Sequence, residues 1–99
     1  MTLRHPVRIP GITELPHSGR GMRIGLFGGS FNPIHEGHRL VVEETLRRLE
    51  LDMLWVLVTP GNPLKNHGEL APLTDRVEAA RHLLDHPKVR VTGFEAAQG

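Results

Sequence analysis

The chain is 99 residues long, 38% of them hydrophobic, with a formal net charge of +1 and no cysteine. This length allows one small domain or part of a larger one and excludes two full domains. The balanced charge excludes a strong field for nucleic acid or an acidic membrane, and the lack of cysteine excludes disulfides and cysteine zinc sites. No apolar run approaches the roughly 20 residues of a membrane-spanning helix. We therefore expect a cytoplasmic protein that binds neither nucleic acid nor membrane.

Residues 1–21 differ in composition from the rest of the chain. They hold several prolines and glycines, few large apolar residues and no hydrophobic period. Such a segment buries too little apolar surface to order itself, which predicts a flexible N-terminal extension. The folded part is expected over residues 22–99.

In the rest of the chain, apolar runs alternate with helical patterns. Continuous apolar runs predict strands at residues 23–27, 53–58 and 89–92. Helical spacing predicts one helix from about residue 36 to 49 and a second that begins at an N-cap at Thr74 or Asp75. The side chains expected to face the core are Val42, Leu46 and Leu49, broadened by Leu40 and Val41, in the first helix and Val77, Ala80 and Leu84 in the second.

The order of these elements predicts an α/β fold. Right-handed crossovers place the strands of a β-α-β-α-β unit in the order 3-2-1, as one half of a three-layer, Rossmann-like parallel sheet. In the complete doubly wound plan a further strand lies beside the first one. Without it, the strand at 23–27 would be an exposed apolar edge. Residues 22–99 are therefore interpreted as the N-terminal half of a Rossmann-like domain.

The segment after the first strand carries the chemistry, and it contains Gly28, Gly29, Ser30, Phe31, Asn32, Pro33, Ile34, His35, Glu36, Gly37 and His38. Glycines at the end of a strand let backbone N–H groups approach an anion. His35 and His38 are three residues apart at a helix start, so both lie on one face of the first turn. Gly37 between them keeps that face low. The pattern predicts a phosphate-binding loop with two imidazole donors.

Other interpretations of this segment compete with phosphate binding. Its glycines do not follow the dinucleotide pattern G-x-G-x-x-G, and no Gly-Lys-Ser/Thr of a Walker A loop is present. A zinc site would need a suitably spaced third ligand to accompany His35 and His38, so no protein-bound metal is predicted. The remaining alternative is an exposed helix start that binds nothing.

The segment resembles the signature of the nucleotidyltransferase superfamily with the His-x-Gly-His motif, and in detail that of the bacterial nicotinate-mononucleotide adenylyltransferases. Residues 59–65 are similar to that family's proline-containing loop with a basic residue, and 75–77 to its acidic/polar-x-Arg region. Pantetheine-phosphate adenylyltransferases usually carry Thr at the position of His35. Cytidylyltransferases favour Phe-Asp-x-x-His, where this chain has Phe-Asn-Pro-Ile-His at 31–35.

The resemblance implies transfer of AMP from ATP to nicotinate mononucleotide, assisted by Mg²⁺, giving deamido-NAD and pyrophosphate. Members of the family run to about twice this length, so the chain is expected to be an incomplete enzyme whose activity alone is doubtful. The alternatives are a non-catalytic phosphate-binding fragment, or an adenylyltransferase for nicotinamide mononucleotide or phosphopantetheine. ATP and nicotinate mononucleotide are the expected partners.

The resemblance also implies roles for individual residues. The expected catalytic residues are His35 and His38. The expected nucleotide-binding residues are Phe27, Gly28, Gly29, Ser30, Phe31 and Gly37, and those expected to bind the mononucleotide are Asn62, Lys65 and Arg76. From the residues alone, Lys65 is equally well a solvated loop lysine, and Arg76 is slightly better interpreted as a surface or helix-start residue.

Overall fold

The structure, a computed structural model, describes residues 6–60 and 70–98. Its elements are β1 (Ile24–Gly29), α1 (Glu36–Arg48), β2 (Met53–Val58), α2 (Leu73–Leu83), β3 (Val89–Thr92) and the short 3-10 helix η1 (Phe94–Ala97). The predicted alternation of strands and helices is confirmed. β1 runs two residues further than predicted, because Gly28 and Gly29 still pair with Leu57 and Val58 of β2.

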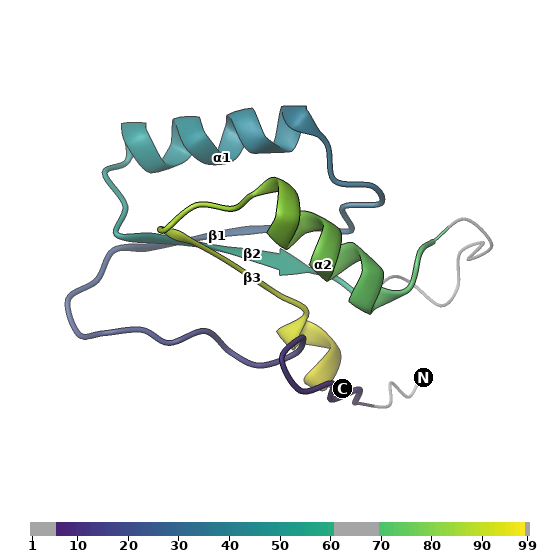
Figure 1. Ribbon diagram of the computed structural model, residues 1–99. Helices are drawn as coiled ribbons and strands as arrows, with labels where there is room; N and C mark the ends of the chain where they lie inside the picture. The colour runs from purple at the N-terminus through teal and green to yellow at the C-terminus, as the bar shows by residue number, and fades with distance from the viewer. Residues whose placement is uncertain (1–5, 61–69, 99) are drawn as a thin grey trace, which may run out of the picture.

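The three strands form a parallel sheet in the order β1-β2-β3, which confirms the predicted α/β fold and strand order. Both crossovers run in the same direction along the sheet, so α1 and α2 cover the same face (Figure 1). The carboxyl ends of β1 and β2 and the first turns of both helices therefore lie at one end of the sheet.

The core lies between the sheet and the two helices. Because side chains alternate along a strand, every second residue of β2 faces the helices. The side chains that form this core are Val42 and Leu46 of α1, Leu54, Val56 and Val58 of β2, Val77 and Ala80 of α2, Leu84 just after it, and Val89 and Val91 of β3. The central strand is therefore buried on the helix side along its whole length.

The two helices differ from their predictions in detail. α1 buries only Val42 and Leu46, while Leu49, predicted to face the core, is the C-cap and is 53% exposed. α2 begins at Leu73 with Pro72 as its N-cap, so the predicted N-cap at Thr74 or Asp75 is wrong. The φ of −55° at Pro72 already suits entry into a helix. The broader apolar face predicted for α1 is also wrong, because Leu40 and Val41 are exposed.

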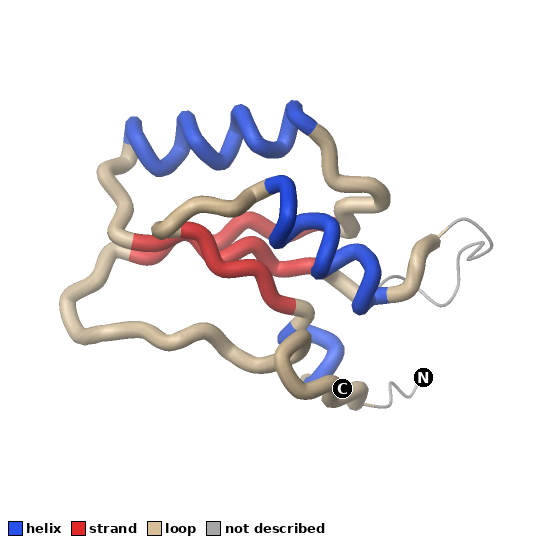
Figure 2. Tube along the Cα trace, viewed as in Figure 1, coloured by secondary structure: helices blue, strands red, loops and turns tan. Residues whose placement is uncertain are grey.

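Part of the N-terminal segment packs against the sheet on the face away from α1 and α2, next to η1 (Figure 2). Ile12 and Thr13 are buried, each with 6% of its surface exposed. The backbone N–H of Gly93 donates to the carbonyl of Ile12 at 2.8 Å, and the Thr92 hydroxyl donates to the carbonyl of Glu14 at 2.6 Å. The composition of 1–21 predicts a flexible extension. Around Ile12 the segment instead gains order from hydrogen bonds to the end of β3, which its composition does not reveal.

The outer edge of β1 has no strand beside it in the part of the chain that the structure describes. Leu26, at the middle of this strand, is 65% exposed. This matches the exposed apolar edge that the half-sheet predicts.

Candidate functional site

The candidate site lies where β1 and β2 end and α1 begins. The backbone N–H of Thr59 donates to the carbonyl of Gly29 at 2.9 Å, so the two strands stay joined up to their carboxyl ends. The segment from Ser30 to His35 then leads into α1 at Glu36. In open parallel sheets this end is where ligands bind.

The last two residues of β1, Gly28 and Gly29, are glycines for different structural reasons. A Cβ at Gly28 would meet nothing closer than the carbonyl oxygen of Leu57, at 3.9 Å, so this residue leaves open space beside the strand. A Cβ at Gly29 would lie 3.2 Å from the ring of Phe31. Gly29 is therefore needed for the packing of the loop itself, while Gly28 leaves the backbone accessible.

Phe31 forms the base of the loop. It adopts a φ of +47°, which L-residues rarely take, and only 4% of its surface is exposed. Its ring packs edge-on against Phe27, with ring centres 5.3 Å apart, and against His38, at 5.0 Å. The family resemblance implied that Phe27 and Phe31 bind the nucleotide. The structure shows that both rings pack against the ring of His38.

His35 and His38 form a reciprocal cap at the N-terminus of α1. His35 is the N-cap residue, and its Nδ1 accepts a hydrogen bond from the backbone N–H of Gly37 at 3.1 Å. Nδ1 of His38 accepts one from the backbone N–H of His35, also at 3.1 Å. The ring centres of the two histidines are 3.8 Å apart. The expected pairing of these side chains on one face of the first turn is therefore present in the structure.

This cap determines which nitrogen of each ring carries the proton. An imidazole nitrogen that accepts a hydrogen bond has no proton, so a neutral ring with Nδ1 as acceptor carries its proton on Nε2. Neither Nε2 atom takes part in a hydrogen bond within the part of the chain that the structure describes. Both histidines therefore hold an N–H donor available to an anion.

The pKa of His38 is lowered from its ordinary value, first by burial and then by the neighbouring charge of His35. Both effects disfavour the imidazolium form. Protonation at Nδ1 would also remove the acceptor that His38 offers to the backbone of His35. The neutral ring with its proton on Nε2 is therefore the form that this environment favours near neutral pH.

Gly37 makes room for the ring of His35. A Cβ at position 37 would lie 2.8 Å from Cε1 and 2.9 Å from Nδ1 of that ring, closer than real contacts allow. Any larger residue would displace the imidazole and remove its bond to the backbone of residue 37. The sequence suggested that Gly37 keeps the surface low, and the structure adds a direct steric reason.

Arg76, predicted to contact the mononucleotide, lies inside the protein, with 4% of its surface exposed. Its guanidinium donates to four backbone carbonyls, those of Ser30, Thr59, Pro60 and Ala71. Burial lowers its pKa from the ordinary value. The structure therefore places Arg76 beneath the loops of the site rather than on their surface.

Two predicted site residues, Asn62 and Lys65, lie outside the described residues. One residue that the sequence left without a role is Asn32, whose Oδ1 accepts a hydrogen bond from the backbone N–H of Ala71 at 3.0 Å. The signal for it was a short polar side chain in the turn before a proline, a position that often bonds to nearby backbone. Asn32 thus joins the loop after β1 to the segment that leads into α2.

Residues 6–60 and 70–98 contain neither a cluster of metal ligands nor a membrane-spanning helix. No three or more His, Cys, Asp or Glu side chains gather there closely enough to hold a metal ion. None of the helices in these ranges is both long and apolar enough to cross a membrane.

Comparison with known proteins places these features in a known group. The family model described as Cytidylyltransferase-like matches residues 26–98, which include the whole candidate site. A probable nicotinate-nucleotide adenylyltransferase of Mesorhizobium japonicum is 58% identical over 83 residues, covering 84% of this chain and 43% of the relative. Those of Rhizobium johnstonii and Methylorubrum extorquens strain PA1 are 54% identical over 85 residues and 63% over 78, covering 86% and 79% of this chain and 43% and 42% of each relative. The chain thus spans less than half the length of these relatives.

Proposed function

The chain belongs to the cytidylyltransferase-like family, and we propose that it forms the phosphate-binding part of an adenylyltransferase acting on nicotinate mononucleotide. The observation that carries this proposal is the reciprocal cap of His35 and His38, which leaves an Nε2–H donor on each ring. The relatives named as nicotinate-nucleotide adenylyltransferases, 54–63% identical, support the choice of acceptor.

In the proposed reaction, an oxygen of the mononucleotide 5′-phosphate attacks the α-phosphorus of ATP. The bond from that phosphorus to the oxygen bridging to the β-phosphate breaks, and its electron pair leaves with pyrophosphate. AMP is thereby joined to the mononucleotide, giving deamido-NAD. Mg²⁺ enters as part of the substrate, bound to the triphosphate. The protein needs no nucleophile of its own, so its contribution is to position the two phosphates and stabilise the developing charge.

We assign His35 and His38 to the phosphates of ATP. Their Nε2–H groups donate to phosphate oxygens, and the cap holds both rings in the tautomer that can donate. The exposed residues Gly28 and Ser30 are proposed to offer room for the nucleotide. Asn62 and Lys65 are proposed to bind the phosphate of the mononucleotide. We also propose a cytoplasmic location for the reaction.

A second candidate function is that of a non-catalytic chain that binds phosphates. It rests on the same reciprocal cap, whose two Nε2–H donors suit a phosphate group whether or not a reaction follows. Both candidates require the same triphosphate site, and only the first requires turnover.

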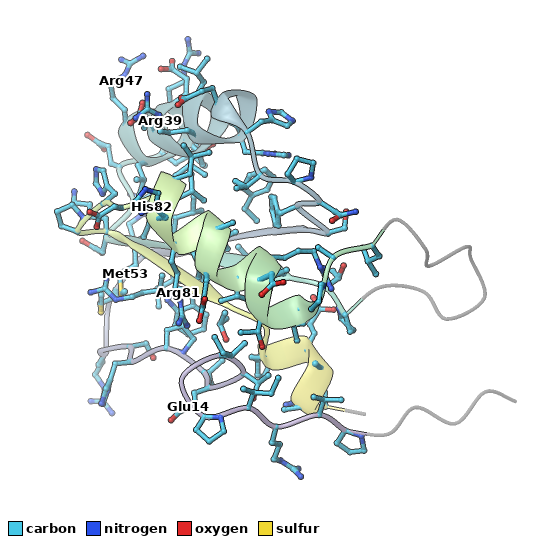
Figure 3. The ribbon with its side chains drawn as sticks, turned by 45° about the vertical axis from the view of Figure 1, so that its right-hand side comes forward. Glu14, Arg39, Arg47, Met53, Arg81 and His82 are labelled. Carbon is cyan, nitrogen blue, oxygen red and sulfur yellow. The ribbon has the colours of Figure 1, made fainter. Side chains whose placement is uncertain are left out.

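Binding of MgATP to the 99-residue chain, measured by calorimetry, tests the part common to both candidates. We expect His35→Ala and His38→Ala each to weaken binding by about 10- to 100-fold, because a hydrogen bond to a charged group contributes about 1.5–3 kcal/mol. His82→Ala is the matched control, since His82 is exposed in the last turn of α2 (Figure 3). Equal affinities for all four proteins would refute the site.

Release of pyrophosphate from MgATP and nicotinate mononucleotide tests whether these 99 residues carry out the reaction of the first candidate on their own. We expect the 99-residue chain to bind MgATP without releasing pyrophosphate, as suits a part of the catalytic unit. Pyrophosphate release that His38→Ala abolishes would instead show that these 99 residues carry out the whole reaction.

A further inference from the structure

Arg76 is the most extensively hydrogen-bonded side chain in this part of the molecule. Its Nε donates to the carbonyl of Ala71 at 2.7 Å, and its Nη1 donates to those of Ser30 at 3.0 Å and Thr59 at 2.7 Å. A longer bond of 3.5 Å joins Nη2 to the carbonyl of Pro60. Only the planar, forked guanidinium has enough donors in fixed directions to serve all these acceptors.

The acceptors of Arg76 come from three different segments. Ser30 follows directly after β1, Thr59 and Pro60 follow β2, and Ala71 precedes α2. These are the segments that meet at the carboxyl end of the sheet, where the candidate site lies. One buried side chain therefore sets the spacing between both strand ends and the start of α2.

A short series of contacts leads from Arg76 to the histidine pair. Its bond to the carbonyl of Ser30 holds the residue just before Phe31. The buried ring of Phe31 in turn packs edge-on against His38, with ring centres 5.0 Å apart. A change in the position of Ser30 would therefore tilt or shift the ring whose Nε2–H faces the ligand.

The charge of Arg76 acts at the same end of the sheet. None of the ion pairs found within residues 6–60 and 70–98 includes this guanidinium, which is surrounded by carbonyl oxygens instead. The positive charge of a buried guanidinium creates a field that favours an anion nearby.

We propose that Arg76 is a positioning residue for the triphosphate site, which holds the loop after β1 and thereby the ring of His38 without touching the substrate. This assignment differs from the direct substrate contact that the family resemblance implied for it. It rests on the proposed function only for the identity of the ligand.

The test compares the chain with Arg76→Lys and Arg76→Met, first without ligand. Two-dimensional NMR measures the backbone amides of residues 28–38 and the Cε1–H signals of both histidines. We expect both variants to move the signals of Ser30, Phe31 and His38. The shifts should be smaller in Arg76→Lys than in Arg76→Met, because lysine keeps the positive charge and one donor nitrogen. Arg81→Met is the matched control. Arg81 lies on the same helix and also donates to a backbone carbonyl, that of Val91 at the end of β3 (Figure 3).

MgATP titration of the same proteins completes the test. We expect the affinity for MgATP to fall about tenfold or more in Arg76→Met and less in Arg76→Lys. The reason is that a binding group displaced from its position makes a weaker contact with the ligand. Arg81→Met should bind as tightly as the original chain. Affinity is compared only among variants whose far-UV circular dichroism and unfolding transition show a folded protein.

The possible outcomes separate this inference from the proposed function. Unchanged signals at Ser30, Phe31 and His38 in folded Arg76→Lys would overturn the positioning role, whatever the chain binds. Changed signals in a chain that shows no affinity for MgATP would support the positioning role and refute the phosphate site. If Arg76→Met fails to fold, the same NMR signals in Arg76→Lys alone test the positioning role of Arg76.

Discussion

The two helices begin at the same end of the sheet but are built in different ways (Figure 1). The start of α1 is exposed, and two imidazole rings cap it. The start of α2 has no side-chain cap, and the first-turn residue Arg76 is buried and bonds to carbonyls of the surrounding loops. One helix start keeps ring N–H groups available, while the other uses its donors within the protein.

This difference separates binding from support. His35 and His38 satisfy the backbone through Nδ1 and leave Nε2 for a ligand. Arg76 instead supplies the hydrogen bonds that hold the loops in place. A site that must bind a flexible, highly charged ligand gains from such division, since preorganised donors need no rearrangement when the ligand arrives.

The largest expected effect comes from removing the support at α2. Arg76→Met leaves the carbonyls of Ser30, Thr59 and Ala71 without their donor, and we expect the free energy of unfolding to fall by about 3 kcal/mol, since each buried unsatisfied group costs about 1–3 kcal/mol and water can satisfy some of them. Arg81→Met, on the exposed side of the same helix, should cost less than about 1 kcal/mol. Urea denaturation followed by circular dichroism measures both. Equal losses in the two variants would remove the distinction between a supporting and a surface arginine.

The fold was largely predictable because it depends on hydrophobic patterns. The apolar run of β2 and the spacing of Val77, Ala80 and Leu84 indicate buried positions directly. The structure buries these three residues and four of the six residues of β2. The packing of Ile12 was not predictable, since it depends on hydrogen bonds to residues about 80 positions away along the chain. Local composition contains no information on such contacts.

The site was predictable only as far as its local motif. The glycines and the spacing of His35 and His38 indicated an anion site, and the structure brings these residues together. The reciprocal cap and the tautomers that it selects depend on atomic geometry that no spacing specifies. The burial of Arg76 arises from the meeting of three segments far apart in the sequence, so a helix-start arginine looked like a surface or substrate-binding residue.

A second, smaller effect is expected at the start of α1. Gly37→Ala places a methyl group 2.8 Å from the imidazole of His35 and should break its bond to the backbone, which costs about 1 kcal/mol for a lost N-cap. In an ordinary helix, replacing glycine by alanine stabilises the helix by up to about 1 kcal/mol. The loss of the cap and the gain in helix propensity therefore have opposite effects on the free energy of unfolding. We expect no net gain in the free energy of unfolding, and a marked shift of the His35 ring signals in NMR spectra.

Gly28→Ala is the control for this substitution. Its methyl group would meet nothing closer than 3.9 Å, so the protein should keep its stability within about 0.5 kcal/mol and the signals of His35 should not move. A clear stabilisation of Gly37→Ala with unchanged His35 signals would show that the imidazole cap contributes nothing to the start of α1.

The smallest expected effect is a dependence of stability on pH that arises at the start of α1. The pKa of His38 is lowered from 6.5 in the folded protein, by burial against Phe27 and Phe31 and by the charge of His35. The unfolded chain therefore binds more protons at this residue as the pH falls below about 6.5, so stability due to His38 is complete above that pH and is lost as the pH falls through the lowered pKa. His38→Gln removes the titrating group but keeps an acceptor able to reach the backbone of residue 35. We expect the free energy of unfolding, measured between about pH 7.5 and pH 5, to fall more steeply in the original chain than in His38→Gln. Parallel curves of unfolding free energy against pH would show that protonation of His38 does not oppose the cap.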